Sequence, residues 1–200
     1  NFEGRDERLL PWPRTKEAIL EEMAVYYSVI DHIDKQIGRI IDQLRSDGRL
    51  KNTCVIFTSD HGLALGSHGL MGKQNMYEHT IRVPLILAGP GIPNGKRSKA
   101  LCYLRDLYPT ICDIVGISIP LEVEGKSLKP LLTGQKDELY TEVYGYFRNK
   151  QRMISNYRFK LIHYPHLDRY QLFDLSEDPK ELKDLSEDSA HKATLARLRG

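Results

Sequence analysis

The sequence predicts an α/β protein with a partial, mostly parallel sheet and flanking helices, followed by a small α+β subdomain built on an antiparallel sheet. Two short apolar runs, NTCVIFTSD and RVPLILAG, are typical of buried parallel strands. Helical periodicity occurs before the first run and after the second. Beyond about residue 134 the sequence changes to strand-like segments separated by polar turns. We therefore expect two parts, residues 1–135 and residues 136–200.

The first helix is expected from about Glu17 to Leu44. Apolar residues recur there at steps of three and four, as in one face of a helix. These residues are Ile30, Ile33, Ile37, Ile40, Ile41 and Leu44. Thr15 can cap the start of this helix, and Gly48 can close its end.

A second, shorter helix is expected in LRDLYPTICDIVGI, with apolar residues along one side. These residues are Leu104, Leu107, Tyr108, Ile111 and Val115. The following EGKSLKPLLTG is interpreted as a loop and turn region. In the subdomain, ELYTEVYGYF, QRMISNYRFKLIHY and RYQLFDL predict three antiparallel strands, and HKATLARLR predicts a short amphipathic helix. Alternation in the middle strand places Tyr157, Phe159, Leu161 and His163 on one face, with Arg158 and Lys160 on the other.

Composition narrows the classes of function. The net charge of +2 gives no indication of nucleic-acid binding or of attraction to an anionic membrane. No apolar run reaches the roughly 18 residues that a membrane-spanning helix needs. The start, NFEGRDERLLPWPR, lacks the apolar centre of a signal peptide. The three cysteines, Cys54, Cys102 and Cys112, form neither a metal-binding pair nor a disulfide framework.

The end of the first apolar run carries the candidate site. Asp60 and His61 follow the strand directly and offer a carboxylate oxygen and an imidazole nitrogen, which together suit a divalent cation. Four glycines follow, which would let the backbone approach a ligand, and Lys73 could project a cation toward an anionic group. Each residue alone is more typical of a strand end or a solvated loop. Their order and spacing together favour a site.

The same residues resemble a known family. SDHG at a strand end resembles the metal-binding segment of the alkaline phosphatase superfamily. The continuation LGSHGLMGK, followed by YEHTIRVPLILAGPGI, resembles the sulfatase branch, and His61 resembles the iduronate-sulfatase and choline-sulfatase side of that branch. The helix YYSVIDHIDKQIGRIIDQL and the tail YQLFDLSEDPKELKDL are similar to sulfatases too. The resemblance covers nearly the whole chain and implies an alkaline phosphatase-like fold.

The resemblance implies roles for single residues. Asp60 and His61 correspond to two ligands of one Ca²⁺, and Lys73 corresponds to a lysine that contacts the sulfate ester near its bridging oxygen. His68 matches a loop histidine that either acts in catalysis or supports the residues that do. The role of His79 stays open. Tyr77, Glu78 and Arg82 fall in a family motif and are interpreted as mainly structural.

The nucleophile motif of the family is not in this sequence. Sulfatases use a formylglycine made from Cys or Ser in C/S-x-P-x-R, and none of the three cysteines or any serine has that context. We therefore expect this chain to be the C-terminal part of a sulfatase, with the formylglycine and the other Ca²⁺ ligands upstream, and to be inactive alone. The expected substrate is a sulfated small molecule or glycan, without nucleic-acid binding or membrane insertion. Family habit implies a periplasmic, extracellular or lysosomal location, and unpaired strand edges make a homo-oligomer possible.

Two other functions are left open by the sequence. One is hydrolysis of phosphonate monoesters or phosphodiesters by the same superfamily, including the less favoured two-zinc phosphodiesterases, which also use an Asp–His pair. The other is a binding module that keeps the fold without catalysis. The upstream sequence distinguishes an enzyme from a binding module, and the metal distinguishes zinc from calcium enzymes.

Overall fold

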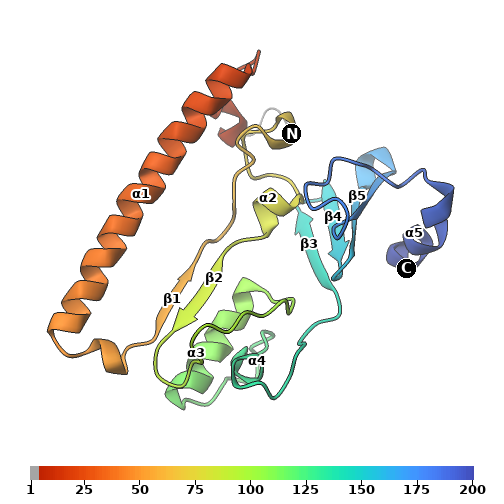
Figure 1. Cartoon of the computed structure of the whole chain (residues 1–200). Helices are drawn as coiled ribbons and strands as arrows, with labels where there is room; N and C mark the ends of the chain where they lie inside the picture. The colour runs from red at the N-terminus through yellow and green to blue at the C-terminus, as the bar shows by residue number, and fades with distance from the viewer. Residues whose placement is uncertain (1–4) are drawn as a thin grey trace. The chain divides into compact units, whose positions relative to one another are not determined.

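The computed structural model of the chain describes residues 5–200. The described residues form two compact units, residues 5–75 with His79–Pro90, and Met76–Glu78 with Gly91–Gly200. The mixed α/β class with an antiparallel sheet near the C-terminus is confirmed (Figure 1). The boundary expected between residues 135 and 136 stays a prediction, and the first four residues of the expected domain 1–135 lie outside the described residues.

The first unit contains the long helix α1 (Lys16–Ser46) (Figure 1). Its start is fixed by Thr15, whose side chain accepts a hydrogen bond from the Ala18 amide, as predicted. Gly48 follows the helix with a positive φ of 70°, a conformation that favours glycine. The helix was therefore predicted to within two residues at each end.

Two short strands complete the first unit. β1 (Val55–Thr58) pairs with β2 (Leu85–Ala88) in antiparallel register, with Val55 opposite Ala88 and Thr58 opposite Leu85. The parallel pairing expected from the sequence is wrong for these two strands. An apolar run indicates burial but not direction, and the connection 59–84 is long enough for either orientation. Because Thr58 pairs with Leu85, the connection 59–84 begins and ends at the same end of this two-stranded sheet.

Helix α2 (Glu78–Ile81) lies within the connection between these strands, and α3 (Leu107–Val115) and α4 (Lys129–Thr133) belong to the second unit. The segment interpreted as a loop thus contains a short helix. Asp106, fully buried, joins α3 to the chain that follows. Its carboxylate accepts hydrogen bonds from the amides of Tyr103 and Lys126 and from the Tyr140 hydroxyl. Burial, followed by the hydrogen bond and negative charge of Asp106, raises the pKa of Tyr140 to about 12.

A four-stranded antiparallel sheet in the order β3-β4-β5-β6 forms the rest of the second unit. The strands are β3 (Val143–Phe147), β4 (Gln151–Ser155), β5 (Phe159–Tyr164) and β6 (Arg169–Asp174). The run expected to be one strand is therefore a hairpin, because Asn156 accepts hydrogen bonds from the amides of Arg158 and Phe159 and closes a turn between β4 and β5. Helix α5 (Lys192–Arg199) covers one face of the sheet. A leucine cluster forms the core there, comprising Leu161, Leu172, Leu185 and Leu198.

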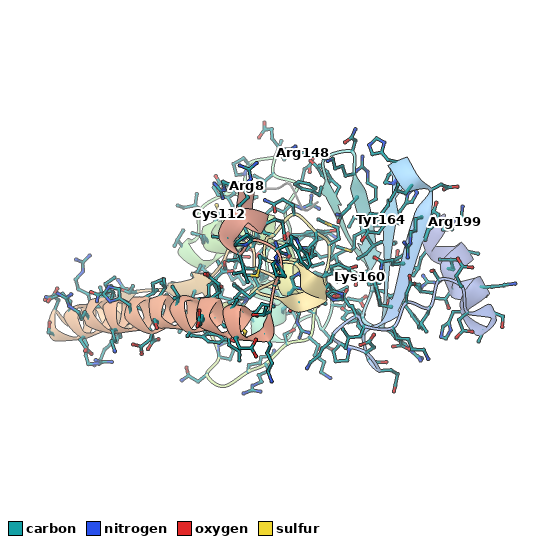
Figure 2. All side chains as sticks on the ribbon, turned by 90° about the horizontal axis from the view of Figure 1, so that it is seen from above. Arg8, Cys112, Arg148, Lys160, Tyr164 and Arg199 are labelled. Atoms are coloured by element: carbon teal, nitrogen blue, oxygen red, sulfur yellow. The ribbon has the colours of Figure 1, made fainter. Side chains whose placement is uncertain are left out.

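The other face of this sheet holds a buried lysine (Figure 2). Lys160 is fully buried, and its ammonium lies 2.6 Å from a carboxylate oxygen of Glu78 and 2.7 Å from one of Glu181. It also donates a hydrogen bond to the Met76 carbonyl. Tyr77 donates to the side chain of Gln171 on the same face. Residues 76–78 are thus held on the sheet by buried polar contacts, as the structural interpretation of Tyr77 and Glu78 anticipates.

Several apolar side chains stay exposed. In α1 no residue is buried, and Ile33 and Ile40 are 48% and 60% exposed. The side of α3 expected to be apolar is also open, since Tyr108, Ile111 and Val115 are exposed whereas Pro109 and Cys112 are buried. Nothing among residues 5–200 covers these side chains. None of the described helices is long and apolar enough to cross a membrane.

Acid sensitivity of this sheet is expected from Asp174 at the end of β6. Burial alone would raise its pKa, but hydrogen bonds from Arg158 and Ser176 outweigh burial and lower the pKa from 3.8 to about 2. Because the folded carboxyl has the lower pKa, its stabilising contribution is complete above the ordinary value of 3.8 and is lost as the pH falls toward 2.

We therefore expect the Tm of the full-length protein to fall between about pH 5 and about pH 2, and to fall less steeply in Asp174→Asn. Calorimetry across this range measures both slopes. Glu187→Gln, an exposed carboxylate replaced in the same way, should keep the wild-type slope. Equal slopes in Asp174→Asn and wild type would show that this contact carries no pH dependence.

Candidate active site

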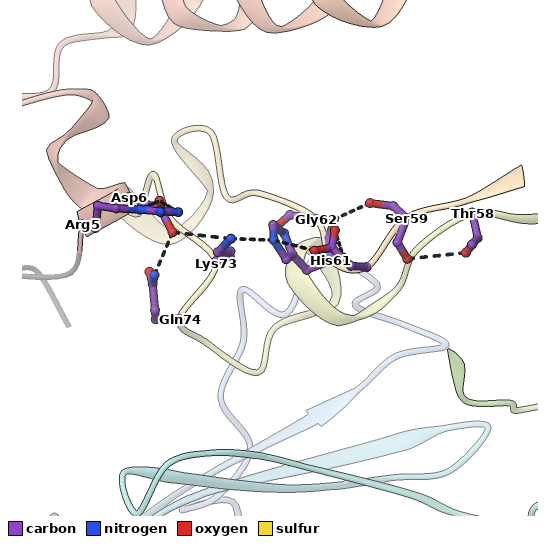
Figure 3. A network of polar contacts seen from close by, with 9 residues as sticks. Arg5, Asp6, Thr58, Ser59, His61, Gly62, Lys73 and Gln74 are labelled. Carbon is purple, nitrogen blue, oxygen red and sulfur yellow. Dashed lines mark hydrogen bonds and ion pairs between the residues drawn. The ribbon is translucent and has the colours of Figure 1, made fainter. Parts of the chain in front are cut away.

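Three side chains at the carboxyl end of β1 lie together (Figure 3). The Nε2 atom of His61 is 2.6 Å from the Lys73 ammonium and 3.3 Å from a carboxylate oxygen of Asp60. The structure thus brings Asp60, His61 and Lys73 into one cluster, as the sequence predicts. Their expected roles in metal and sulfate binding stay predictions.

The ring of His61 is oriented by its own loop. Its Nδ1 atom lies 3.1 Å from the Gly62 carbonyl oxygen, which places the proton of a neutral ring on Nδ1. Nε2 then carries a lone pair and accepts a hydrogen bond from the Lys73 ammonium. That lone pair also faces a carboxylate oxygen of Asp60, and two such acceptors stay close only when a cation or proton lies between them. The positive charge of Lys73 partly meets this need.

These donor atoms match part of a cation site. A carboxylate oxygen and a neutral imidazole nitrogen are both ligands of divalent cations, and the Asp60 side chain is 82% exposed and therefore accessible. Two ligands cannot complete a Ca²⁺ site, which takes about six to eight oxygen ligands. Within residues 5–200, no group of three or more His, Cys, Asp or Glu side chains could hold a metal ion. Asp60 and His61 therefore fit as part of a divalent-cation site.

A buried carboxylate supports the loop that carries Lys73. Glu7, in a 3-10 helix (Arg5–Leu9), accepts hydrogen bonds from the amides of Met71 and Gly72 and pairs with Arg14 at 2.8 Å. The side chains of Glu7 and Arg14 are only 3% and 2% exposed. Arg14 also donates to the Gly69 carbonyl, so the pair contacts the loop at both ends of residues 69–72. We call Glu7 and Arg14 the loop clamp.

Asp6 contacts the same loop on the other side of Lys73. Its carboxylate accepts a hydrogen bond from the Gln74 side chain and lies 3.9 Å from the Lys73 ammonium. Burial alone would raise the pKa of Asp6, but Arg5, Gln74 and the charge of Lys73 lower it. Burial alone would likewise raise the pKa of Glu7, but hydrogen bonds from the Met71 and Gly72 amides and the contact with Arg14 lower it. Both carboxylates are therefore held in their charged form.

Neither Asp6 nor the loop clamp was found by sequence reasoning. They precede their partners in the loop by 55 to 68 residues, and the charged run RDER, which contains Asp6 and Glu7, is typical of a solvated segment. No local pattern indicates that these charges are buried against the loop.

Glycine is required at two positions of the site loop, because other parts of the protein lie close to the backbone there. A Cβ at Gly62 would lie 2.0 Å from the His79 carbonyl oxygen, and one at Gly72 would lie 2.8 Å from a carboxylate oxygen of Glu7. At these two positions the expectation that glycine admits a ligand is wrong, because the space is filled by neighbouring protein atoms. Glycine here permits packing of the loop.

The loop histidines form a separate pair. His68 has a positive φ of 54°, which is uncommon for a residue with a side chain. Its ring lies 5.7 Å from the ring of His79, measured between centroids. The catalytic or supporting role expected for His68 stays a prediction, and so does the role of His79.

The fold defines an α/β protein of the alkaline phosphatase-like fold, and its strand-end loop brings Asp60, His61 and Lys73 together. The chain belongs to the sulfatase family, whose family model, Sulfatase, matches residues 3–117. A second model, N-sulphoglucosamine sulphohydrolase, C-terminal, matches residues 66–200. The expected membership is therefore confirmed.

Individual proteins agree with this membership. An arylsulfatase of Clostridium perfringens is 35% identical over an alignment of 203 positions, which covers 98% of this chain and 42% of the relative. An N-acetylglucosamine-6-O-sulfatase of Bacteroides thetaiotaomicron is 34% identical over 82% of this chain and 32% of its own length. The crystal structure of a phosphonate monoester hydrolase of Agrobacterium radiobacter superposes with a TM-score of 0.82 at 28% identity, over 92% of this chain and 41% of that one. The chain thus spans well under half of the relatives that it matches.

Proposed function

We propose that this chain is part of an enzyme that hydrolyses sulfate esters. The observation that carries the proposal is the cluster in which His61 Nε2 contacts both the Lys73 ammonium and the Asp60 carboxylate. Membership of the sulfatase family supports it. A sulfated small molecule or a sulfated glycan is the substrate class that we propose.

In this proposal Asp60 and His61 hold a Ca²⁺ ion together with residues outside this chain. When bound, the ion neutralises negative charge on the sulfate oxygens. The Nδ1 proton of His61 is donated to the Gly62 carbonyl, which leaves the Nε2 lone pair for the ion when the Lys73 ammonium contacts the substrate instead. Asp6 contributes a negative charge 3.9 Å from the Lys73 ammonium, which helps to hold that side chain near the cluster. A formylglycine from another part of the protein is the proposed nucleophile.

Lys73 acts on the leaving group. As the ester bond breaks, negative charge develops on the bridging oxygen, and a positioned ammonium stabilises that charge more than it stabilises the bound substrate. The loop clamp fixes the backbone immediately before Lys73, so the ammonium does not have to be ordered during the reaction. His68 is proposed to support this loop.

A second candidate is hydrolysis of phosphonate monoesters, which the superposition with the Agrobacterium enzyme favours. A location outside the cytoplasm is a further proposal, which family habit supports. Assembly of several copies is another, which the exposed apolar side chains of α1 and α3 support.

Assays of the full-length protein with an aryl sulfate and the matching aryl phosphonate ester test the proposal. We expect a higher kcat/KM for the sulfate, and activity that a calcium chelator removes and Ca²⁺ restores. A higher kcat/KM for the phosphonate would favour the second candidate. Inactivity on both esters, in protein with C/S-x-P-x-R upstream and bound Ca²⁺, would contradict both enzymatic functions and favour a binding module.

A further inference from the structure

One residue from each strand of the C-terminal sheet forms a row of aromatic and basic side chains. Tyr146 of β3 is opposite Arg152 of β4, Arg152 is opposite His163 of β5, and His163 is opposite Tyr170 of β6. Residues paired in this way project from the same face of a sheet and touch their neighbours. We call these four residues the aromatic-basic row.

Three members of the row, Arg152, His163 and Tyr170, line a hollow of about 200 Å³ at the end of helix α5. The rings of His163 and Tyr170 are stacked at 4.2 Å with an angle of 4° between their planes. The guanidinium of Arg199, at the end of α5, lies 4.4 Å from the centre of the Tyr170 ring. That of Arg152 lies 5.7 Å from the centre of the Tyr146 ring. The lining of the hollow therefore contains a stacked pair of aromatic rings and two cationic groups.

Polar groups in the hollow are available to a ligand. Neither Arg152 nor Arg199 forms an ion pair within the described part of the chain, although Arg152 donates to the carbonyls of Arg148 and Gln151. The Nε2 atom of His163 is buried and has no hydrogen-bond partner among residues 5–200. No carboxylate lines the hollow. The nearby Glu142 is engaged by Arg197 at 3.0 Å and by the Tyr144 hydroxyl.

The core of the subdomain does not account for these side chains. The next row on the same face, which includes Ile154, Leu161 and Leu172, is apolar and is covered by α5. Tyr144 and Tyr146, by contrast, are 62% and 73% exposed. The opposite face of the sheet carries Lys160 and packs against residues 76–78, so the row does not take part in that contact.

We propose that the aromatic-basic row, with Arg199, binds a sulfated sugar unit of a glycan chain. This inference rests on the proposed function and names its substrate class. Planar guanidinium groups bind sulfate and carboxylate oxygens in pairs, and arginine is the cation best suited to this geometry. The ring of Tyr144, which lines the same hollow and is 62% exposed, offers apolar surface to a sugar ring at small entropic cost. A ligand with both anionic groups and apolar ring faces, spaced within one hollow, is a sulfated sugar.

The residues of the row also define what the site does for turnover. The row includes none of Asp60, His61 and Lys73, so in this proposal it holds a part of the glycan other than the ester being cleaved. Binding there raises the affinity for polymeric substrate and leaves the hydrolysis of a small aryl sulfate unchanged.

The test uses full-length protein and the double variant Arg152→Gln/Arg199→Gln. Isothermal titration with a heparin-derived oligosaccharide should give a Kd about tenfold or more higher than wild type, the scale of one or two lost charge-assisted hydrogen bonds. The kcat/KM for a small aryl sulfate should stay within about twofold. Arg97→Gln, an exposed arginine of the same unit, is the matched control and should bind as wild type does. A chemically desulfated oligosaccharide should bind weakly to all variants.

Three results would overturn the inference. The first is an unchanged Kd in the double variant, and the second is an equal loss of aryl-sulfate turnover. The third is a change in oligomeric state, by sedimentation, with unchanged glycan binding, which would assign the row to an interface between copies. Titration does not require turnover, so absence of sulfatase activity in the wild type would contradict the proposed function separately.

Discussion

Replacing Lys73 with alanine in the full-length enzyme should lower kcat for an aryl sulfate by about a hundredfold or more, the usual scale for one contact to charge that develops in the transition state. The ammonium lies 2.6 Å from His61 and 3.9 Å from Asp6, so it is positioned by the protein before substrate arrives. Its removal also leaves the Asp60 and His61 acceptors facing each other without that positive charge.

Kinetics and calorimetry separate this role from a structural one. We expect kcat to fall more than KM rises, because the contact is made mainly in the transition state. The Tm should change little, since the Lys73 side chain is 30% exposed and does not fill the core. Lys192→Ala, an exposed lysine of α5, is the matched control. Wild-type turnover in the Lys73→Ala protein would show that this lysine is not at the leaving group.

The elements that could be predicted are those whose sequence signals lie within a short stretch of the chain. The cap at Thr15, the isoleucine periodicity and Gly48 were enough to place α1, and the strand-end position of Asp60 and His61 followed from the apolar run before them. Lys73 is close in sequence to both, so one loop could be expected to bring the three together. Family resemblance added the chemical meaning of this loop.

Features that depend on distant partners could not be predicted. Strand direction was wrong for β1 and β2 because burial looks the same in both orientations. Alternation placed Lys160 opposite the apolar face, yet it is fully buried, since Glu78 and Glu181 supply charges that no local pattern reveals. The same reason explains why Glu7 was missed: its partners in the loop lie 64 and 65 residues away.

The loop clamp leads to the second prediction, that Glu7→Ala destabilises the full-length protein by about 3–5 kcal/mol, the range for removing one partner of a buried ion pair. The variant leaves the Arg14 charge buried without its carboxylate and leaves the Met71 and Gly72 amides without their acceptor. Chemical unfolding measures the loss. Turnover should fall as well, because the released backbone is directly followed by Lys73.

A matched set of variants shows whether charge burial is the cause. Glu187→Ala removes an exposed carboxylate and should cost little. The double variant Glu7→Gln/Arg14→Met removes both charges and should be more stable than Glu7→Ala, because neither buried charge is then left uncompensated. If Glu7→Ala unfolds with the free energy of the Glu187→Ala control, the contacts of Glu7 do not hold the loop. In that case the position of Lys73 must be set by the segment between β1 and β2 alone.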